Sequence, residues 1–322
     1  PQAAFYAWIN SHPNWASLVS AGQKILICDI GGGTTDFTLI RVNPAGGGKV
    51  LFHRIAVGDH LILGGDNMDL ALAHHVEKKL TDGGRLDPRQ WGPLVRACRV
   101  VKETLLGEAP PAEYTLSLSG GGSRLIGGAV RVELSRGEVE QVLVDGFLPA
   151  TKLADRPAAR RSGFQEFGLP YAPDAGITRY LAAFLRAHAN PEDAGDSLGA
   201  ARPDLVLFNG GFFDSPALRA RLLEVLSGWF KPADAAWRPQ VLDNDRLDLA
   251  VARGAAYYGM VRRGFGTRIS GGLAHCYYVE VHAADSAAPQ ALCLLPAGIE
   301  EGQSIELADR TFRLLIRQPV EF

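Results

Sequence analysis

Two aspartates flank a run of three glycines near the start of the chain. In the stretch KILICDIGGGTTDFTLIRV, Asp29 ends one apolar run, glycines occupy positions 31–33, and Asp36 begins the next apolar run. Glycine lacks a Cβ and tolerates positive φ, so a ligand can come within hydrogen-bond distance of successive backbone N–H groups, an arrangement that suits phosphate. Two carboxylates beside a phosphate would repel it unless a hard cation or its bound waters lay between them. The pattern therefore predicts a phosphate site with Mg²⁺ nearby.

The apolar runs on either side of the glycines predict the element that positions them. Residues 25–30 and 37–42 are rich in β-branched and large apolar side chains, which predicts two strands joined by a tight turn. In the alternative interpretation the glycines merely close this hairpin and the aspartates cap it. Glycine triplets also occur at 46–48 and 120–122 without the flanking aspartates, and there we predict plain loops.

Composition bounds the class of protein. The 322 residues are 47% hydrophobic and 21% charged, with a formal net charge of -2, which indicates a globular chain of more than one domain. This charge gives no electrostatic case for binding nucleic acid or an anionic membrane, and no apolar run is as long as a membrane span. The four cysteines form no C-x-x-C pair, so buried thiols are expected rather than disulfides or a zinc site.

Hydrophobic periodicity predicts alternating helices and strands along the rest of the chain. A strand at 204–208 leads into a glycine turn and then into a helix that Ser215 caps. Such a strand, turn and helix N-terminus can bind a ligand, which would make this a second binding site. In the alternative interpretation it is an ordinary strand-to-helix turn. Residues 135–138 form a capping-box pattern, and 150–173 predict an exposed loop or lid. The further helices are expected at 2–20, 64–80, 91–105, 177–185 and 247–261, and the further strands at 50–57, 113–134, 241–242, 276–281, 291–295, 304–307 and 311–316.

Several motifs resemble those of one protein family. DIGGGTTDF resembles the second phosphate-binding motif of the actin-fold ATPase superfamily, which includes actin-like filament proteins, sugar kinases and the seventy-kilodalton heat-shock (DnaK-like) chaperones. PQAAFYAWI, GGDNMDLAL, DLVLFNGGFFDSP and LDLAVARGAA resemble, in this order, further chaperone motifs. ALCLLPAGIEEGQSIEL resembles the first strands of the chaperones' β-sandwich substrate domain, which the other two groups lack. The chain is therefore identified as a divergent DnaK-like member.

The resemblance implies an α/β fold, an actin-like (ribonuclease H-like) ATPase lobe with an inserted α+β subdomain and a short all-β extension. Residues 1–21 would be a helix of an incomplete first lobe and 22–266 mainly the second lobe. Within that lobe, 64–198 would be the inserted subdomain and 247–264 a closing first-lobe helix. Residues 267–322 would begin the β-rich substrate-binding domain. The family's first phosphate motif, its catalytic lysine and a catalytic glutamate would precede Pro1, so we expect a piece of a longer protein that does not hydrolyse ATP alone.

The resemblance also implies site residues, a nucleotide and a cation. Asp29 would position the attacking water and hydrated Mg²⁺, Asp36 would lie near a second cation, and Thr34 would complete the catalytic set with them. The aspartates would hold the metal through water. The positions implied to contact ATP or ADP are Gly31, Gly32, Gly33, Thr34, Gly64, Gly65, Lys102, Gly210, Gly211 and Asp248.

Departures from the family pattern concern the adenosine end. The helix that grips adenosine carries Arg99, Glu103 and Leu106 where the family has other residue types, and Asp214 replaces an arginine that stacks on adenine. Phe212 or Phe213 is a candidate to stack instead, and weaker, less base-selective binding is expected.

The resemblance implies a chaperone ATPase that couples its nucleotide state to peptide binding, and it leaves two alternatives. One is a degenerate, non-catalytic interaction module with the same fold. The other is an actin-like polymerising protein, which the β-rich tail disfavours. The expected partners are client peptides and co-chaperones, with no nucleic acid or membrane, and the expected location is the cytoplasm.

Overall fold

A six-stranded mixed sheet forms the centre of the structure, a computed structural model that describes residues 1–81, 85–118, 130–158, 172–244, 246–273, 275–281, 290–300 and 302–307. The strand order is β7-β6-β1-β2-β3-β8. The three central strands β1, β2 and β3 are antiparallel, and β6, β7 and β8 add in parallel at the two edges. The strands are β1 (Lys24–Ile30), β2 (Thr35–Pro44), β3 (Val50–Val57), β6 (Leu205–Asn209), β7 (Gln240–Leu242) and β8 (Ile269–Ser270).

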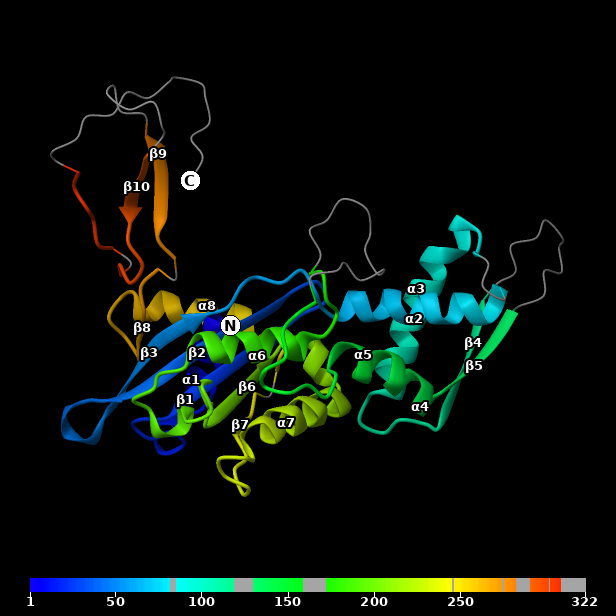
Figure 1. The fold of residues 1–322 in the computed structure, drawn as a ribbon, viewed down its shortest axis with the longest axis horizontal. Helices are drawn as coiled ribbons and strands as arrows, with labels where there is room; N and C mark the ends of the chain where they lie inside the picture. The colour runs from blue at the N-terminus through cyan, green and yellow to red at the C-terminus, as the bar shows by residue number, and fades with distance from the viewer. Residues whose placement is uncertain are drawn as a thin grey trace.

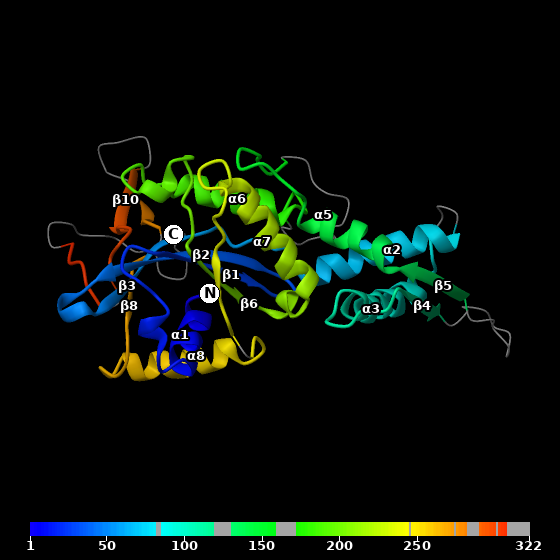
Figure 2. The ribbon, with the colours of Figure 1, turned by 90° about the horizontal axis from the view of Figure 1, so that it is seen from below.

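Helices cover both faces of this sheet, because alternate residues of each strand point to opposite sides. Ile25 and Ile27 of β1 pack in the cluster that holds α1 (Gln2–Ser11) and Val261 of α8 (Ala250–Val261). Leu26 and Cys28 pack in the other cluster, with α6 (Ile177–Ala187) and α7 (Pro216–Phe230). Figure 2 shows α1 and α8 on one side of the sheet and α6 and α7 on the other.

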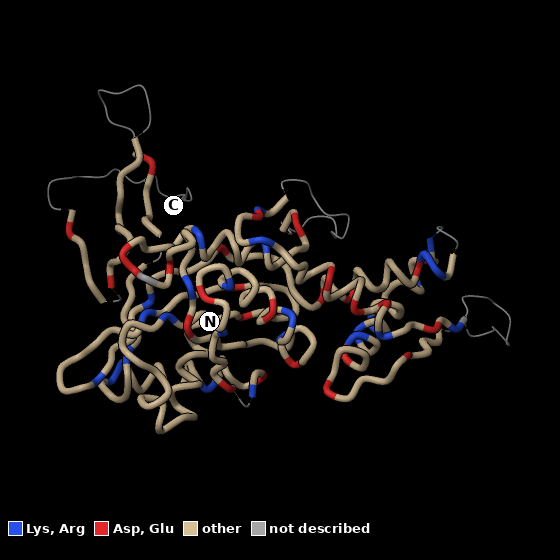
Figure 3. The backbone as a smooth tube through the Cα atoms, turned by 60° about the horizontal axis from the view of Figure 1, so that its bottom comes forward, with Lys and Arg blue, Asp and Glu red and all other residues tan. Residues whose placement is uncertain are grey.

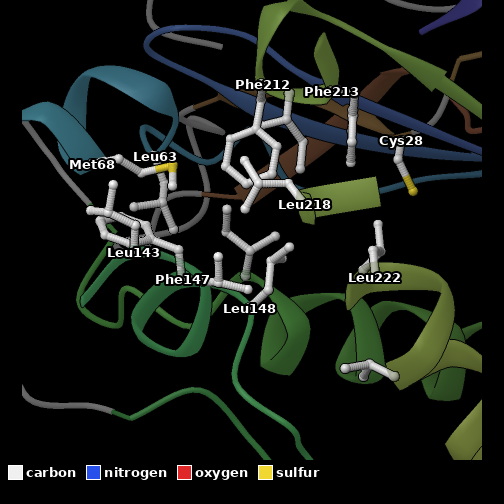
Figure 4. Packing of buried hydrophobic residues seen from close by; sticks show 14 of the residues in the cluster. Cys28, Leu63, Met68, Leu143, Phe147, Leu148, Phe212, Phe213, Leu218 and Leu222 are labelled. Atoms are coloured by element: carbon white, nitrogen blue, oxygen red, sulfur yellow. The ribbon is translucent and has the colours of Figure 1, made fainter. Parts of the chain in front are cut away.

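A second group of elements lies at one end of the molecule, beyond the end of β1 and β2 (Figure 1). It contains α2 (Gly65–Thr81), α3 (Pro88–Leu105), the antiparallel pair β4 (Glu113–Leu118) and β5 (Val130–Ser135), α4 (Arg136–Val139), a π-helical turn (Glu140–Val144) and α5 (Asp145–Phe147). The predicted apolar stripe of α2 packs in the main core: Met68, Leu72 and Val76 are fully buried. Figure 4 shows Met68 beside Leu143 and Phe147, with Phe212 and Leu218 close by. One apolar core thus runs from the sheet into this end.

The remaining described elements are a hairpin of β9 (Tyr277–Val281) and β10 (Gln290–Leu295) and four short 3-10 turns, Trp15–Ser17, Gly46–Gly48, Ala194–Asp196 and η5 (Gly211–Asp214). Lysines and arginines are interspersed with aspartates and glutamates along the whole tube of Figure 3. Within the described residues, no helix is long and apolar enough to cross a membrane.

The α/β class that the sequence predicts is confirmed, whereas three local predictions are wrong. The first helix ends at Ser11 rather than near residue 20, because His12 precedes a proline, which disfavours the helical conformation. Residues 304–307 form no strand. Cys276 is exposed, although Cys28 and Cys98 are buried as expected. The predicted strand at 311–316, the loop at 120–122 and residues 159–171 of the predicted lid lie outside the described residues.

Candidate functional site

The turn between β1 and β2 presents its backbone amides to solvent. The N–H of Gly31 donates to the carbonyl of Thr34 at 2.9 Å and closes the turn. The N–H groups of Gly32, Gly33 and Thr34 donate to no acceptor that the structure describes. Three adjacent free donors suit an anion. None of the three glycines has positive φ, so open space, rather than backbone geometry, distinguishes Gly31 and Gly33.

The first turn of α2 holds the other side of this loop. The N–H of Gly65 donates to the carbonyl of Gly31 at 3.0 Å, and the N–H of Asp66 donates to that of Gly32 at 2.7 Å. A Cβ on Gly64 would lie 2.6 Å from both of these carbonyl oxygens, so only glycine allows the approach. These contacts satisfy donors that the start of a helix otherwise leaves unpaired. The loop and α2 are therefore joined by backbone alone.

A second glycine packs against the end of β1 from the side of β6. Gly210 has φ +87°, and a Cβ there would lie 2.1 Å from the carbonyl oxygen of Ile30. Gly211, the next residue, begins the turn that leads through the Ser215 cap into α7. The strand-to-helix turn predicted from the sequence thus lies beside the glycine turn, as the parallel pairing of β1 with β6 requires.

The two aspartates lie directly opposite each other across the hairpin. Oδ1 of Asp29 accepts a hydrogen bond from Nδ2 of Asn209 at 2.8 Å, and Oδ2 lies 2.9 Å from the nitrogen of Pro1, the first residue of the given sequence. Asp36 contacts Nδ1 of His60 at 2.8 Å. Asn209 and His60 were not among the predicted site residues. Asn209 lies in the motif at 204–216, but only its neighbours Gly210 and Gly211 match family contact positions, and His60 lies in none of the motifs.

A cavity of about 300 Å³ opens next to the glycine turn, between α2, α3 and the start of α7. One face of α3 lines it with residues three and four apart, Arg99, Lys102, Glu103 and Leu106. Since a helix rises 1.5 Å per residue, this face extends along roughly 10 Å of the cavity. The other lining residues are Gly31, Gly32, Gly65, Asp66, Met68, Gly107, Gly211, Phe212, Asp214, Ser215 and Leu218.

The buried carboxylate of Asp69 holds Arg99 and Lys102, the two positively charged side chains on the face of α3 that lines the cavity. Asp69 is 1% exposed; Nζ of Lys102 lies 2.6 Å from its Oδ1, and Nε of Arg99 donates to its Oδ2 at 2.9 Å. Lys102 also donates to the carbonyl of Gly65 at 3.0 Å. The hydrogen bond to Asp69 raises the pKa of the Arg99 guanidinium. The lysine is thus held beside the start of α2, next to the free amides.

The far end of the cavity contains one of the two phenylalanines that the sequence offers for stacking on a base. Phe212 lines the cavity, whereas Phe213 is fully buried, packs against Phe208 and does not line it. Leu106 is 1% exposed, and Ser215 donates its hydroxyl to the Leu106 carbonyl at 2.6 Å. Of the two phenylalanines, therefore, Phe212 remains a candidate for stacking on a base.

The structure brings most of the predicted site residues together around the turn. Gly31, Gly32, Gly65, Lys102 and Gly211 line the cavity. Gly33, Thr34, Asp29, Asp36, Gly64 and Gly210 belong to the adjoining turn or pack against it. Asp248 is not among the cavity residues: it is exposed and paired with Arg246 at 2.8 Å.

Comparison with known proteins agrees with this geometry. Residues 17–154, which contain the glycine turn, α2 and α3, match the model of the family described as Hsp70 protein. The resemblance to the Hsp70 family is confirmed. The Hsp70-like segment does not reach Gly210, Gly211 or Asp248.

The similar curated proteins carry a chaperone name. The chain is 36% identical over 96 residues to the "Chaperone protein HscA homolog" of Burkholderia orbicola, an alignment that covers 30% of the chain and 14% of the relative. The corresponding protein of Shewanella sp. (strain MR-4) is 36% identical over 99 residues, with the same shares. That of Pseudomonas aeruginosa (strain LESB58) is 30% identical over 139 residues, covering 43% of the chain and 20% of the relative. The chain thus spans only about a fifth or less of these relatives.

Proposed function

We propose that this chain is the nucleotide-binding part of a DnaK-like chaperone ATPase and that it binds the phosphates of ADP or ATP at the glycine turn. The observation that carries the proposal is the set of free amides at Gly32, Gly33 and Thr34 beside a cavity that Lys102 enters. Amide dipoles and one ammonium provide positive charge for phosphate oxygens, and the rest of the cavity provides apolar walls for a nucleoside.

The donor set beside the turn fits a hard cation. Asp29 and Asp36 supply carboxylate oxygens, the ligands that Mg²⁺ prefers, and they lie opposite each other one residue from the turn. When bound, Mg²⁺ would neutralise charge on the phosphates. Asp29 would orient the attacking water, while the turn holds the terminal phosphates and Lys102 the diphosphate. Phosphoryl transfer depends mainly on such positioning and charge stabilisation, so these residues need not form covalent bonds.

The finer parts of the proposal concern the whole protein. We assign residues 22–266 mainly to the second lobe of an actin-like domain, with residues 64–198, from α2 to α6, as the inserted subdomain. We assign α1 and α8 to the first lobe. The hairpin β9–β10 would begin a substrate-binding domain. The partners proposed for the complete protein are client peptides and co-chaperones, and the proposed location is the cytoplasm.

One observation favours the alternative, a non-catalytic interaction module with the same fold. Arg99 points to Asp66 and Asp69 rather than to an open site, and Leu106 presents no hydrogen-bonding side chain at the apolar end. A nucleoside would therefore find few directed partners there, and a chain that no longer uses nucleotide would tolerate such changes.

A ligand-soaked crystal tests the proposal. With ADP, sulfate or phosphate supplied at millimolar concentration, density is expected against the amides of residues 32–34. Density elsewhere, with nothing at the turn, would contradict the proposed site. Calorimetry of the same chain with ADP separates the two functions, because the interaction module predicts no measurable heat.

A further inference from the structure

A buried asparagine at the end of β6 has no role in the function proposed so far. Asn209 is 2% exposed and follows four buried apolar residues of its strand. Its Nδ2 donates to Asp29 at 2.8 Å, whereas its own Oδ1 is buried without a hydrogen-bond partner in the described structure. Burying an amide without satisfying its oxygen is costly, so an apolar residue would stabilise this strand better. A polar residue retained here needs a reason other than stability.

The reason lies in how the Asp29 carboxylate is held. Parallel pairing of β1 with β6 places Asn209 directly beside Asp29, 180 residues away in the sequence. The amide engages Oδ1 only. The second oxygen, Oδ2, accepts a hydrogen bond from no side chain that the structure describes, and the Asp29 side chain is 18% exposed. One oxygen is thus fixed by a neutral donor, and the other is left open to a cation.

We propose that Asn209 is a positioning residue, which holds Asp29 so that Oδ2 is presented to the cation that accompanies a bound nucleotide. The inference rests on the proposed function, since it assigns Asn209 to the same site. A carboxylate on a free χ torsion would populate several orientations and lose that freedom on binding the cation. The hydrogen bond from Asn209 removes this cost in advance, which is the general advantage of a preorganised ligand.

The geometry predicts that the loss of Asn209 weakens binding of the cation rather than binding of the nucleotide. Asn209 is not among the residues that line the cavity, so its loss removes no contact to ADP. The measured quantity is the ratio of the Kd for ADP in EDTA to the Kd in MgCl₂, determined by calorimetry on the 322-residue chain. We expect a ratio of about ten or more for the wild type, in the range that one charge-assisted interaction contributes.

The substitution Asn209→Leu keeps the volume and removes the donor. We expect it to lower this ratio toward one, by about tenfold, while the Kd in EDTA stays unchanged. Thr178→Val is the matched control, because Thr178 is fully buried, makes one hydrogen bond, to the Pro149 carbonyl at 2.9 Å, and lies away from the site on α6. It should leave both values unchanged. If Asn209→Leu does not fold, as judged by circular dichroism, Asn209→Ala is used instead.

The outcomes separate this inference from the function on which it rests. A folded Asn209 variant that keeps the wild-type ratio would overturn the positioning role and leave nucleotide binding intact. A wild type whose Kd for ADP is the same in EDTA and in MgCl₂ would also overturn the positioning role. A wild type that binds no ADP would refute the proposed function itself.

Discussion

Replacing Gly210 by alanine should destabilise the fold and disable the phosphate turn, whereas the same replacement at Gly22 should only destabilise. Both glycines have left-handed φ, +87° and +92°, so each alanine costs about 1–2 kcal/mol in backbone conformation. At Gly22 a Cβ meets nothing within 4 Å. At Gly210 it would lie 2.1 Å from the carbonyl oxygen of Ile30 and 3.0 Å from the nitrogen of Gly31.

The close contact at Gly210 adds a second cost. The ends of β1 and β6 must move apart by more than about 1 Å, and overpacking of this kind costs about 1–3 kcal/mol. The expected loss of unfolding free energy is therefore about 2–5 kcal/mol for Gly210→Ala against about 1–2 kcal/mol for Gly22→Ala.

Urea denaturation followed by tryptophan fluorescence measures both losses, and calorimetry with ADP measures the second effect. Because Gly31 begins the turn, Gly210→Ala should also weaken ADP binding, whereas Gly22→Ala should not. Equal losses of stability in the two variants, or unchanged ADP affinity in Gly210→Ala, would show that the approach of the two strands is not as tight as the structure has it.

Four further predictions concern the cavity, the chemistry and the charges. Lys102→Met should raise the Kd for ADP by about tenfold in calorimetry, because the variant removes the one lysine that lines the described cavity. ADP and GDP should bind with Kd values within about tenfold of each other, and tight ADP binding with no GDP binding would contradict this view of the apolar end. Steady-state phosphate release from the chain should stay at background, as in an Asp29→Asn control. Mg²⁺-dependent release that this variant abolishes would show that the residues around the glycine turn suffice for hydrolysis. The hydrogen bond from Arg41 holds the pKa of Asp193 below its ordinary 3.8. The Asp193 carboxylate therefore stabilises the fold above that pH, and this stabilisation is lost as the pH falls through the pKa of Asp193 in the folded protein. Asp193→Asn should lower the melting temperature at pH 7, and the difference from the wild type should shrink in acid.

Local patterns were sufficient to predict the elements that carry the site. The period of Met68, Leu72 and Val76 predicted a helix with one buried face, and that face is buried. The β-branched runs around the glycines predicted the hairpin that places Asp29 opposite Asp36. Such patterns are visible in the sequence because the residues buried on one face of a strand or helix lie two, three or four apart in the chain.

Long-range pairings could not be predicted in the same way. The role of Asn209 depends on a strand 180 residues from Asp29, and no local pattern shows which strands will be neighbours. The predicted capping box at Ser135 forms only in part. Its hydroxyl accepts from the N–H of Glu138 at 3.2 Å, but the glutamate carboxylate contacts His75 and Lys79. His75 and Lys79, which come from elsewhere in the fold, thus compete with the local partner that a capping box would give Glu138.

The glycine turn carries its polarity in the main chain, and this affects how the site can change over evolutionary time. The carbonyls of Gly31 and Gly32 are engaged by the first turn of α2, while the N–H groups of Gly32, Gly33 and Thr34 donate to no described acceptor. A pocket made of lysines loses its charge when a lysine is replaced. Here a neutral side chain at residues 31–34 can obstruct the turn, but the N–H dipoles remain. Substitutions around Arg99, Leu106 and Asp214, where we propose that the nucleoside binds, can therefore accumulate while affinity for the anionic part of a ligand persists.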